Sequence, residues 1–228
     1  MLKDCLFLWA AAFFFMGCIA SSHRSGITLR PGQYSVSGSY LRASNMEETD
    51  AEAVQLIAVD GRAGLAEGLD VGLMHTFDIS KGNDGAYETT WADLKVQCTN
   101  RDNVVGKPVF SVGLLKGYLI EEVDDETVEY HFTGIPLMIS IPTHANITPF
   151  FMYRHMYIWD KFIPEEFKDP RSTFLLGAEF TLGTPSPDGW VPKLGVSIGT
   201  MNSLLGGSEG DRVLLLNFGL SVDSPPKR

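Results

Sequence analysis

Apolar and polar residues alternate near the end of the chain, in the stretch 211–222. The even positions there carry large apolar side chains: Leu214, Leu216, Phe218, Leu220 and Val222. After Leu215, the odd positions carry Asn217, Gly219 and Ser221. Because side chains alternate across a β-strand with a period of two, this pattern predicts a strand with one fully apolar face. At roughly 9–11 residues, such a strand is also long enough to cross a bilayer when tilted.

Nine further stretches show similar strand patterns, which makes ten predicted strands in all. In chain order they cover 34–43, 53–65, 69–79, 91–99, 104–118, 128–141, 147–159, 172–183, 190–201 and 212–222. No segment shows a convincing helical period. In 128–141 the apolar positions change parity near Gly134 and Pro136, which predicts a β-bulge at that point. The sequence therefore predicts an all-β protein.

The polar faces of the late strands are rich in glycine and serine. Strand positions that face water usually favour Thr, Lys and Glu over Gly, because Gly weakens a strand. Small residues suit the crowded interior of a narrow barrel, whose apolar outer face then meets lipid. A soluble β-sandwich or lipocalin with the apolar face turned inward remains the alternative.

The connections between the predicted strands alternate between long and short. The short ones are 66–68, 100–103, 142–146 and 183–189, and the long ones include 44–52, 80–90, 121–127, 160–171 and 202–211. Alternation of this kind is typical of an antiparallel up-and-down β-barrel with turns at one end and loops at the other. We therefore predict a barrel of about ten strands (8–10), with short turns on the side of both termini and long acidic loops on the other.

Charge is distributed unevenly along the chain. The net charge is −10, which argues against nucleic acid as a partner. The predicted long loops hold most of the acidic residues, and their only bases are Lys81, Lys161, Lys168 and Arg171. Such a rim is either a solvated, repulsive surface or a place where divalent cations or a basic partner bind.

Charged residues also occur on the faces that we predict to line the lumen. They are Asp60, Arg62, Asp70, Asp78, Asp93, Lys95, Arg154, Glu179 and Lys193. A buried charge must be paired, because an unpaired one costs several kcal/mol. The mixed signs therefore favour an ion-pair network that fills the lumen. A small charged pore and a catalytic constellation are the alternatives.

Signals for catalysis or metal binding are weak. His75, His131, His144 and His155 are scattered without metal-ligand spacing, none of them sits in a recognisable nucleophile motif, and Cys98 is the one cysteine outside the leader. We therefore expect no enzymatic activity, no metal site and no cofactor. A lipid-modifying barrel enzyme is kept as a distant alternative.

The chain begins with Lys3 and an uncharged, mostly apolar run over 5–17, which is the layout of a secretory signal peptide. At its end, Phe15-Met16-Gly17-Cys18 resembles the lipobox of bacterial lipoproteins. That resemblance implies a signal peptide at 1–17, acylation of Cys18, a lipidated tether at 18–32 and handling by the lipoprotein-sorting machinery. Ordinary cleavage after Ala20 and a membrane-anchoring helix are the alternatives.

The body of the chain, 33–222, resembles the small outer-membrane β-barrel proteins of Gram-negative bacteria in its alternating strands and asymmetric loops. The resemblance implies an outer-membrane location, contact with outer-membrane lipid, insertion by the barrel-assembly machinery, and a structural, adhesive or transport-related role. Residues 223–228 would form a polar tail. The alternative is a soluble periplasmic lipoprotein whose β-barrel or cup binds an apolar ligand.

Overall fold

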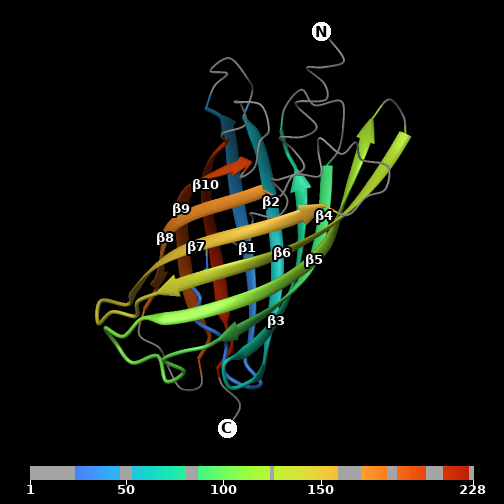
Figure 1. The fold of residues 1–228 in the computed structure, drawn as a ribbon. Helices are drawn as coiled ribbons and strands as arrows, with labels where there is room; N and C mark the ends of the chain where they lie inside the picture. Colours follow the sequence, from blue (N-terminus) through green and yellow to red (C-terminus); the bar gives the residue numbers. More distant parts are fainter. Residues whose placement is uncertain are drawn as a thin grey trace.

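Ten antiparallel strands close into one barrel in the computed structural model (Figure 1), which describes residues 24–46, 53–80, 87–123, 126–158, 171–183, 189–203 and 213–225. The strands are β1 (Tyr34–Asn45), β2 (Val54–Ala66), β3 (Leu69–Asp78), β4 (Tyr87–Gln97), β5 (Val109–Val123), β6 (Glu126–Ser140), β7 (Ile147–Ile158), β8 (Arg171–Thr181), β9 (Val191–Ser203) and β10 (Val213–Asp223). Each strand pairs with the next, and β10 pairs with β1. The predicted all-β, up-and-down barrel of ten strands is thus confirmed. Within the described ranges, no helix is long and apolar enough to cross a membrane.

The barrel is closed by an uninterrupted seam between its first and last strands. Pairing runs from Ser35 opposite Asp223 to Asn45 opposite Val213 without a register shift. Beyond the seam, the Ser224 amide donates to the Tyr34 carbonyl (2.7 Å), and the Tyr34 amide donates to Ser224 Oγ (2.8 Å). Pairing therefore continues into the segment that we predicted to be a polar tail, because Asp223 is the last residue of β10.

The barrel has two ends, which we call the turn end and the loop end. At the turn end, where β1 begins and β10 finishes, the strands are joined by 67–68, 98–108, 141–146 and 182–190. At the loop end they are joined by 46–53, 79–86, 124–125, 159–170 and 204–212. The predicted strict alternation of lengths is therefore wrong, and its clearest exceptions are 98–108 and 124–125.

The first exception is the connection between β4 and β5, which is long although it lies at the turn end. Val104 and Val105 mimic the start of a strand in sequence, yet β5 begins only at Val109. The Asn100 side chain donates to the carbonyls of Val104 (3.0 Å) and Lys107 (2.9 Å), and its Oδ1 accepts from the Val104 amide (2.8 Å). One asparagine thus folds the segment into a local loop.

The second exception is the connection between β5 and β6. We predicted a loop over 121–127, but the two strands pair as far as Val123 opposite Glu126. The hairpin therefore extends past neighbouring strands at the loop end (Figure 1). The reach of this connection comes from longer strands and not from a longer loop.

Register along β6 rules out the predicted bulge. Pairs with β5 before and after Gly134 and Pro136 have the same register, namely Val112 opposite Leu137 and Leu115 opposite Gly134. Phe132 and Ser140 are both buried on the inner face. The apolar pattern changes parity because the lumen itself becomes apolar toward the loop end, so that Phe132 faces inward.

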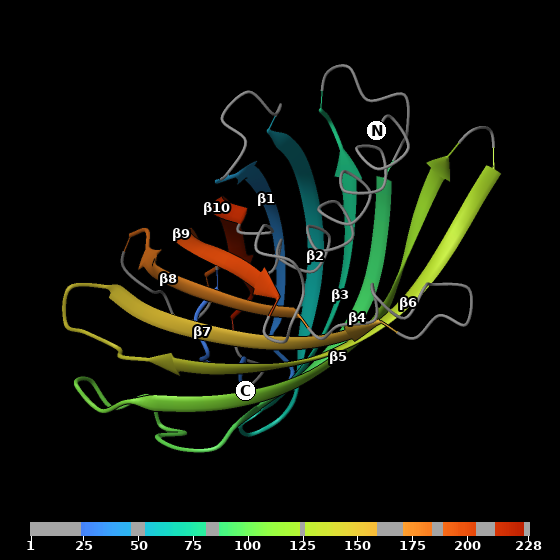
Figure 2. The same cartoon turned by 45° about the horizontal axis from the view of Figure 1, so that its top comes forward.

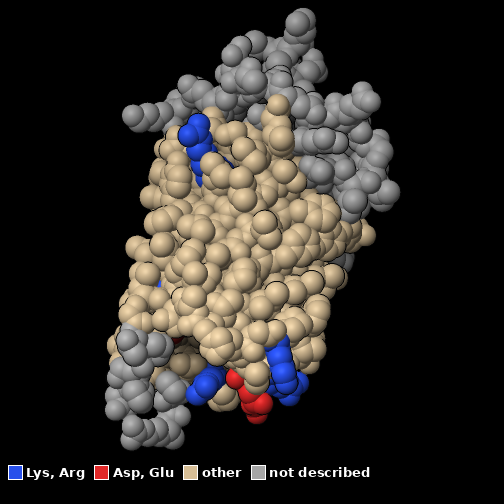
Figure 3. Space-filling view, turned by 90° about the vertical axis from the view of Figure 1, so that its left-hand side faces the viewer, with Lys and Arg blue, Asp and Glu red and all other residues tan. Residues whose placement is uncertain are grey.

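The outer face of the barrel is apolar around its whole circumference. Each strand presents at least one large exposed apolar side chain, namely Val36, Val59, Leu73, Leu94, Leu114, Leu137, Phe151, Leu176, Ile198 and Leu220. On the face in Figure 3, charged side chains lie toward the two ends and leave the middle uncharged. In β10 the even positions Leu216 and Phe218 face outward, and Leu215 and Asn217 are buried inside.

Candidate functional site

The inner wall of the barrel is divided into two chemically different halves, around the interior seen in Figure 2. In β1 the buried positions change from Ser35, Ser37 and Ser39 near the turn end to Leu41 and Ala43 near the loop end. Strands β2 and β10 change in the same sense, which gives a polar half near the turn end and an apolar half near the loop end. Strand β7 differs, because Phe150 and Met152 lie nearer the turn end than Arg154. The apolar half is the buried cluster of Leu41, Ala43, Val54, Leu56, Ala58, Met74, Trp91, Leu115, Phe132, Met152, Met156, Leu175, Met201, Val213 and Leu215.

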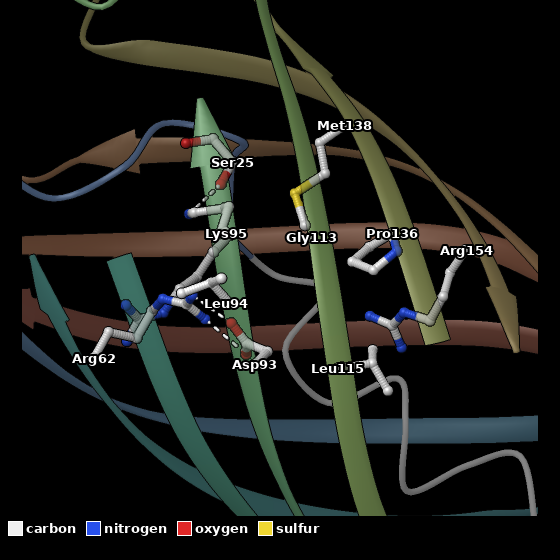
Figure 4. A pocket seen from close by; sticks show the side chains of 11 residues that line it. Ser25, Arg62, Asp93, Leu94, Lys95, Gly113, Leu115, Pro136, Met138 and Arg154 are labelled. Atoms are coloured by element: carbon white, nitrogen blue, oxygen red, sulfur yellow. Dashed lines mark hydrogen bonds and ion pairs between the residues drawn. The ribbon is translucent and has the colours of Figure 1, made fainter. Parts of the chain in front are cut away.

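The first group of charges in the polar half is centred on Asp70, which is fully buried. One Asp70 oxygen accepts from Arg62 Nη2 (2.6 Å), and the other lies 3.4 Å from Lys95 Nζ. Arg62 also contacts Asp93 with both terminal nitrogens, at 2.9 and 2.5 Å (Figure 4). Because neighbouring strands hold these residues side by side, each buried charge meets an opposite one.

A second group of charges lies near the seam, on β8, β9 and β10. Lys193 Nζ is 3.1 Å from Glu179 and 2.9 Å from Asp223. Asp223 also accepts a hydrogen bond of 2.5 Å from the Ser35 hydroxyl, across the seam. This group therefore links the closing strands through their inner side chains as well as through the backbone.

A segment that precedes β1, Arg24–Leu29, lies inside the polar half; we call it the N-terminal strap. Arg24 forms an ion pair with Asp60 (3.0 Å) and donates to Ser35 Oγ (3.0 Å). The Ser25 amide and hydroxyl both donate to Glu179, each at 3.3 Å. Arg24 and Ser25 are buried. These residues belong to the stretch that we predicted to be a tether, and they line the lumen instead.

Further contacts fix the strap along its length. The Gly26 amide donates to Ser140 Oγ (2.7 Å), the Thr28 amide donates to Gln97 Oε1 (2.9 Å), and the Leu29 amide donates to Asp70 (3.1 Å). A Cβ atom on Gly26 would lie 3.0 Å from Met138 Cβ, so the strap approaches the wall closely there. The strap thus bridges β2, β3, β4, β6 and β8 across the lumen.

The apolar half is filled by side chains that lean over small residues of the wall. Trp91 and Phe132 meet edge to face with ring centroids 6.3 Å apart. A Cβ atom on Gly117 would collide with Trp91 and Phe132, and one on Gly134 would lie 3.0 Å from Leu115 and Met156. In an interior packed this closely, truncation of any one side chain removes van der Waals contacts with its neighbours.

A small pocket lies where the two halves meet (Figure 4). Four cationic side chains and one acidic side chain line it, together with Leu115 and Met138 on the apolar side. The charged residues are Arg24, Arg62, Lys95, Arg154 and Asp93. The pocket has room for about one water molecule.

The predicted lumen charges fall into three places. Seven belong to the two charge groups or contact the strap: Asp60, Arg62, Asp70, Asp93, Lys95, Glu179 and Lys193. Arg154 is buried and lines the pocket. Asp78 lies at the loop end of β3, half-buried, where it accepts from the Ser80 amide (2.7 Å). Cys18, the predicted lipidation site, is outside the described residues.

Sequence reasoning missed the partners that come from outside the strand pattern. Arg24 and Ser25 fall in the predicted tether and Asp223 in the predicted tail, although each contacts a charged residue of the inner wall. A signal was present for Asp223, because it continues the inward parity of Asn217 and Ser221. Arg24 and Ser25 carry no periodic signal, since the strap is not a strand.

Histidines and acidic residues do not gather into a metal site in the part of the chain that the structure describes. His75 and His155 lie between buried neighbours, and His131 is exposed beside the buried Phe132, so all three lie on the outer face. Most of the acidic loop residues fall outside the described ranges, so the proposed cation binding at the loops stays a prediction.

Comparisons with known proteins give matches of fold only. No family model matches the chain, and no curated protein matches it. Among solved structures, it is similar to the β-domain of the Bordetella autotransporter BrkA (12% identity, TM-score 0.49), with 86% of this chain and 99% of that chain covered. It is also similar to an outer membrane channel from Pseudomonas putida (11%, TM-score 0.45, covering 86% and 97%) and to Neisserial surface protein A (11%, TM-score 0.37, covering 83% and 95%). At these values the likeness carries no argument about function.

Proposed function

We propose that this protein is an integral outer-membrane β-barrel with a transport-related role and a lumen closed to free passage of water-soluble solutes. The observation that carries the proposal is the apolar outer face, which all ten strands share around an inner wall that holds the buried charges. Soluble proteins rarely expose a continuous apolar surface of this extent. A soluble ligand-binding cup would place these side chains inside.

The closed lumen follows from its contents. The N-terminal strap crosses the polar half, and large side chains fill the apolar half. An open aqueous pore needs a polar, water-filled interior along its whole length. The molecule handled by this barrel is therefore not a free hydrophilic solute.

The proposal includes a signal peptide at 1–17 and acylation of Cys18, supported by the run Phe15-Met16-Gly17-Cys18. Only residues 19–23 separate Cys18 from Arg24, so an extended chain places them within roughly 20 Å of each other. The linker between lipid and barrel is thus shorter than the predicted tether at 18–32, because Arg24–Leu29 are held in the lumen.

Membrane insertion is tested by fractionation and by one pair of substitutions. We expect the full chain to resist carbonate extraction from outer membranes and to migrate faster on SDS gels before heating than after it. Leu216→Arg should cost about 2–4 kcal/mol if the side chain lies near the bilayer midplane, and Leu216→Phe should cost little. The proposal fails if the Cys18→Ser variant is released into the soluble fraction as a folded protein.

The closed lumen is tested separately with proteoliposomes. We expect no swelling in isotonic arabinose beyond that of empty liposomes. Swelling at the rate of an open porin would contradict the closed lumen and leave membrane insertion untouched.

A second candidate role is adhesion, which the extended β5–β6 hairpin favours. Its paired strands carry the chain past neighbouring strands at the loop end, with Val123 opposite Glu126. Shortening both strands symmetrically, by removing 121–123 and 126–128, should then reduce attachment of cells to host or abiotic surfaces. Unchanged attachment by a correctly inserted variant would exclude this role for the hairpin.

A further inference from the structure

We propose that the boundary pocket binds the anionic head of a single-chain amphipathic carboxylate, such as a fatty acid, whose alkyl chain lies in the apolar half. This inference rests on the proposed membrane barrel and names a ligand class for its lumen. Its two parts follow from the two walls of the pocket.

The charged wall of the pocket supplies the head-group site. Arg24, Arg62, Lys95 and Arg154 line the pocket, and Asp93 is the one acidic residue that does so. Asp60 and Asp70, which pair with three of these cations, are not among the lining residues. Two of the three acidic partners of these cations thus lie outside the pocket, while Asp93 pairs with Arg62 at its wall, and the lining itself carries more positive than negative charge.

Guanidinium groups suit a carboxylate in particular. Arginine presents a planar fork of donors that matches the two oxygens of a carboxylate, and hydrogen bonds between ions are stronger than neutral ones. Arg154 is almost fully buried, with 1% of its surface exposed, and its guanidinium comes from β7, across the pocket from Arg62 and Lys95 (Figure 4). A carboxylate in the pocket thus meets cations on two sides.

The apolar wall supplies the site for the chain. Leu115 and Met138 line the pocket, and Met138 packs against the buried cluster that includes Met152 and Met156. A ligand with its head in the pocket therefore meets apolar side chains on the side of Leu115 and Met138, which continue into the buried cluster. A purely polar anion would gain nothing from this wall.

Size restricts the ligand further. The pocket has space for about one water molecule, so a chain enters only where side chains move aside. Methionine is unbranched and flexible, which lets it repack around a slender chain. Met74, Met138, Met152, Met156 and Met201 all lie on the inner wall. A single alkyl chain fits this adaptable lining, whereas a rigid ring system or a two-chain lipid does not.

The experiment measures binding of palmitate to the full chain purified in a nonionic detergent. Radiolabelled palmitate gives the Kd, and quenching of tryptophan emission by 9,10-dibromostearate reports the chain near Trp91. Arg154→Gln should raise the Kd for palmitate at least about tenfold, because it removes a charge-assisted hydrogen bond to the head. Lys116→Gln, which changes an exposed cation of the outer face, is the matched control and should bind as the unaltered protein does.

Three results would overturn the inference. They are an unchanged Kd in a folded Arg154→Gln variant, equal binding of palmitate and its methyl ester, and quenching by dibromostearate that is undiminished in a Trp91→Phe variant. If Arg154→Gln does not fold, the comparison of palmitate with its methyl ester still decides the head-group assignment in the unaltered protein. Absence of palmitate binding by a protein that resists carbonate extraction would refute this inference and leave membrane insertion intact.

Discussion

The two halves of the lumen are built on the same ten strands and are stabilised by different forces. In the polar half, each contact depends on a particular partner, as Asp70 does on Arg62, Lys95 and the Leu29 amide. In the apolar half, Leu, Met and aromatic side chains pack without directional bonds. Paired charges specify one arrangement, whereas dispersion contacts tolerate rearrangement. We therefore expect the polar half to fix the strap and the apolar half to adapt to a ligand.

The largest effect should come from Asp70→Asn in the polar half. The substitution keeps the size of the side chain but leaves Arg62 and Lys95 with one fewer buried counter-charge. Breaking a buried pair in this way costs about 3–5 kcal/mol. Urea unfolding in detergent micelles, followed by the heat-dependent gel shift, measures the loss. Asp102→Asn, in the exposed turn-end loop, is the control and should leave the midpoint unchanged.

A smaller effect is expected for Leu215→Ala in the apolar half. Leu215 is completely buried, so the truncation leaves a cavity and costs about 2–4 kcal/mol. Its chain neighbour Leu216 faces outward, and Leu216→Ala should cost less because the surrounding solvent or lipid fills the space. The same unfolding assay compares them. Equal losses at the two positions would contradict the assigned orientation of β10.

The smallest effect should come from Ser25→Ala in the strap. It removes the hydroxyl that donates to Glu179 at 3.3 Å and leaves the Ser25 amide bond to the same carboxylate in place. We expect a loss of about 1 kcal/mol. Limited proteolysis should cleave the strap faster in the variant than in the unaltered protein. A loss as large as that of Asp70→Asn would show that the strap is a main support of the barrel.

Much of the barrel is predictable from the sequence, because the alternation of strands is a local property. Leu216, Phe218 and Leu220 identify the outer face of β10 without any knowledge of its neighbours. The parity of Asp60, Arg62 and Asp70 likewise places them on the inner wall. The number and order of the strands follow from the same local pattern.

Other features depend on contacts between residues far apart in the chain, and local patterns do not reveal them. Arg24 is held by Asp60 and Ser35, and Ser25 by Glu179, which lies 154 positions away. The apolar half also misled prediction, because Phe132 inside the lumen resembles a lipid-facing residue after a bulge. A one-dimensional pattern shows which residues share a face, but it does not show what fills the space behind that face.

Covalent attachment has a consequence for the strap. The bonds between the strap and the wall form within one molecule. The short connection Pro31–Gln33 therefore sets a high effective concentration of the strap at the wall, and a single contact can open and reclose without release of the strap. Arg30 and Pro31 are exposed at the turn end. A peptide-bond cut at this connection would turn the strap into a separate peptide, whose occupancy would then fall on dilution.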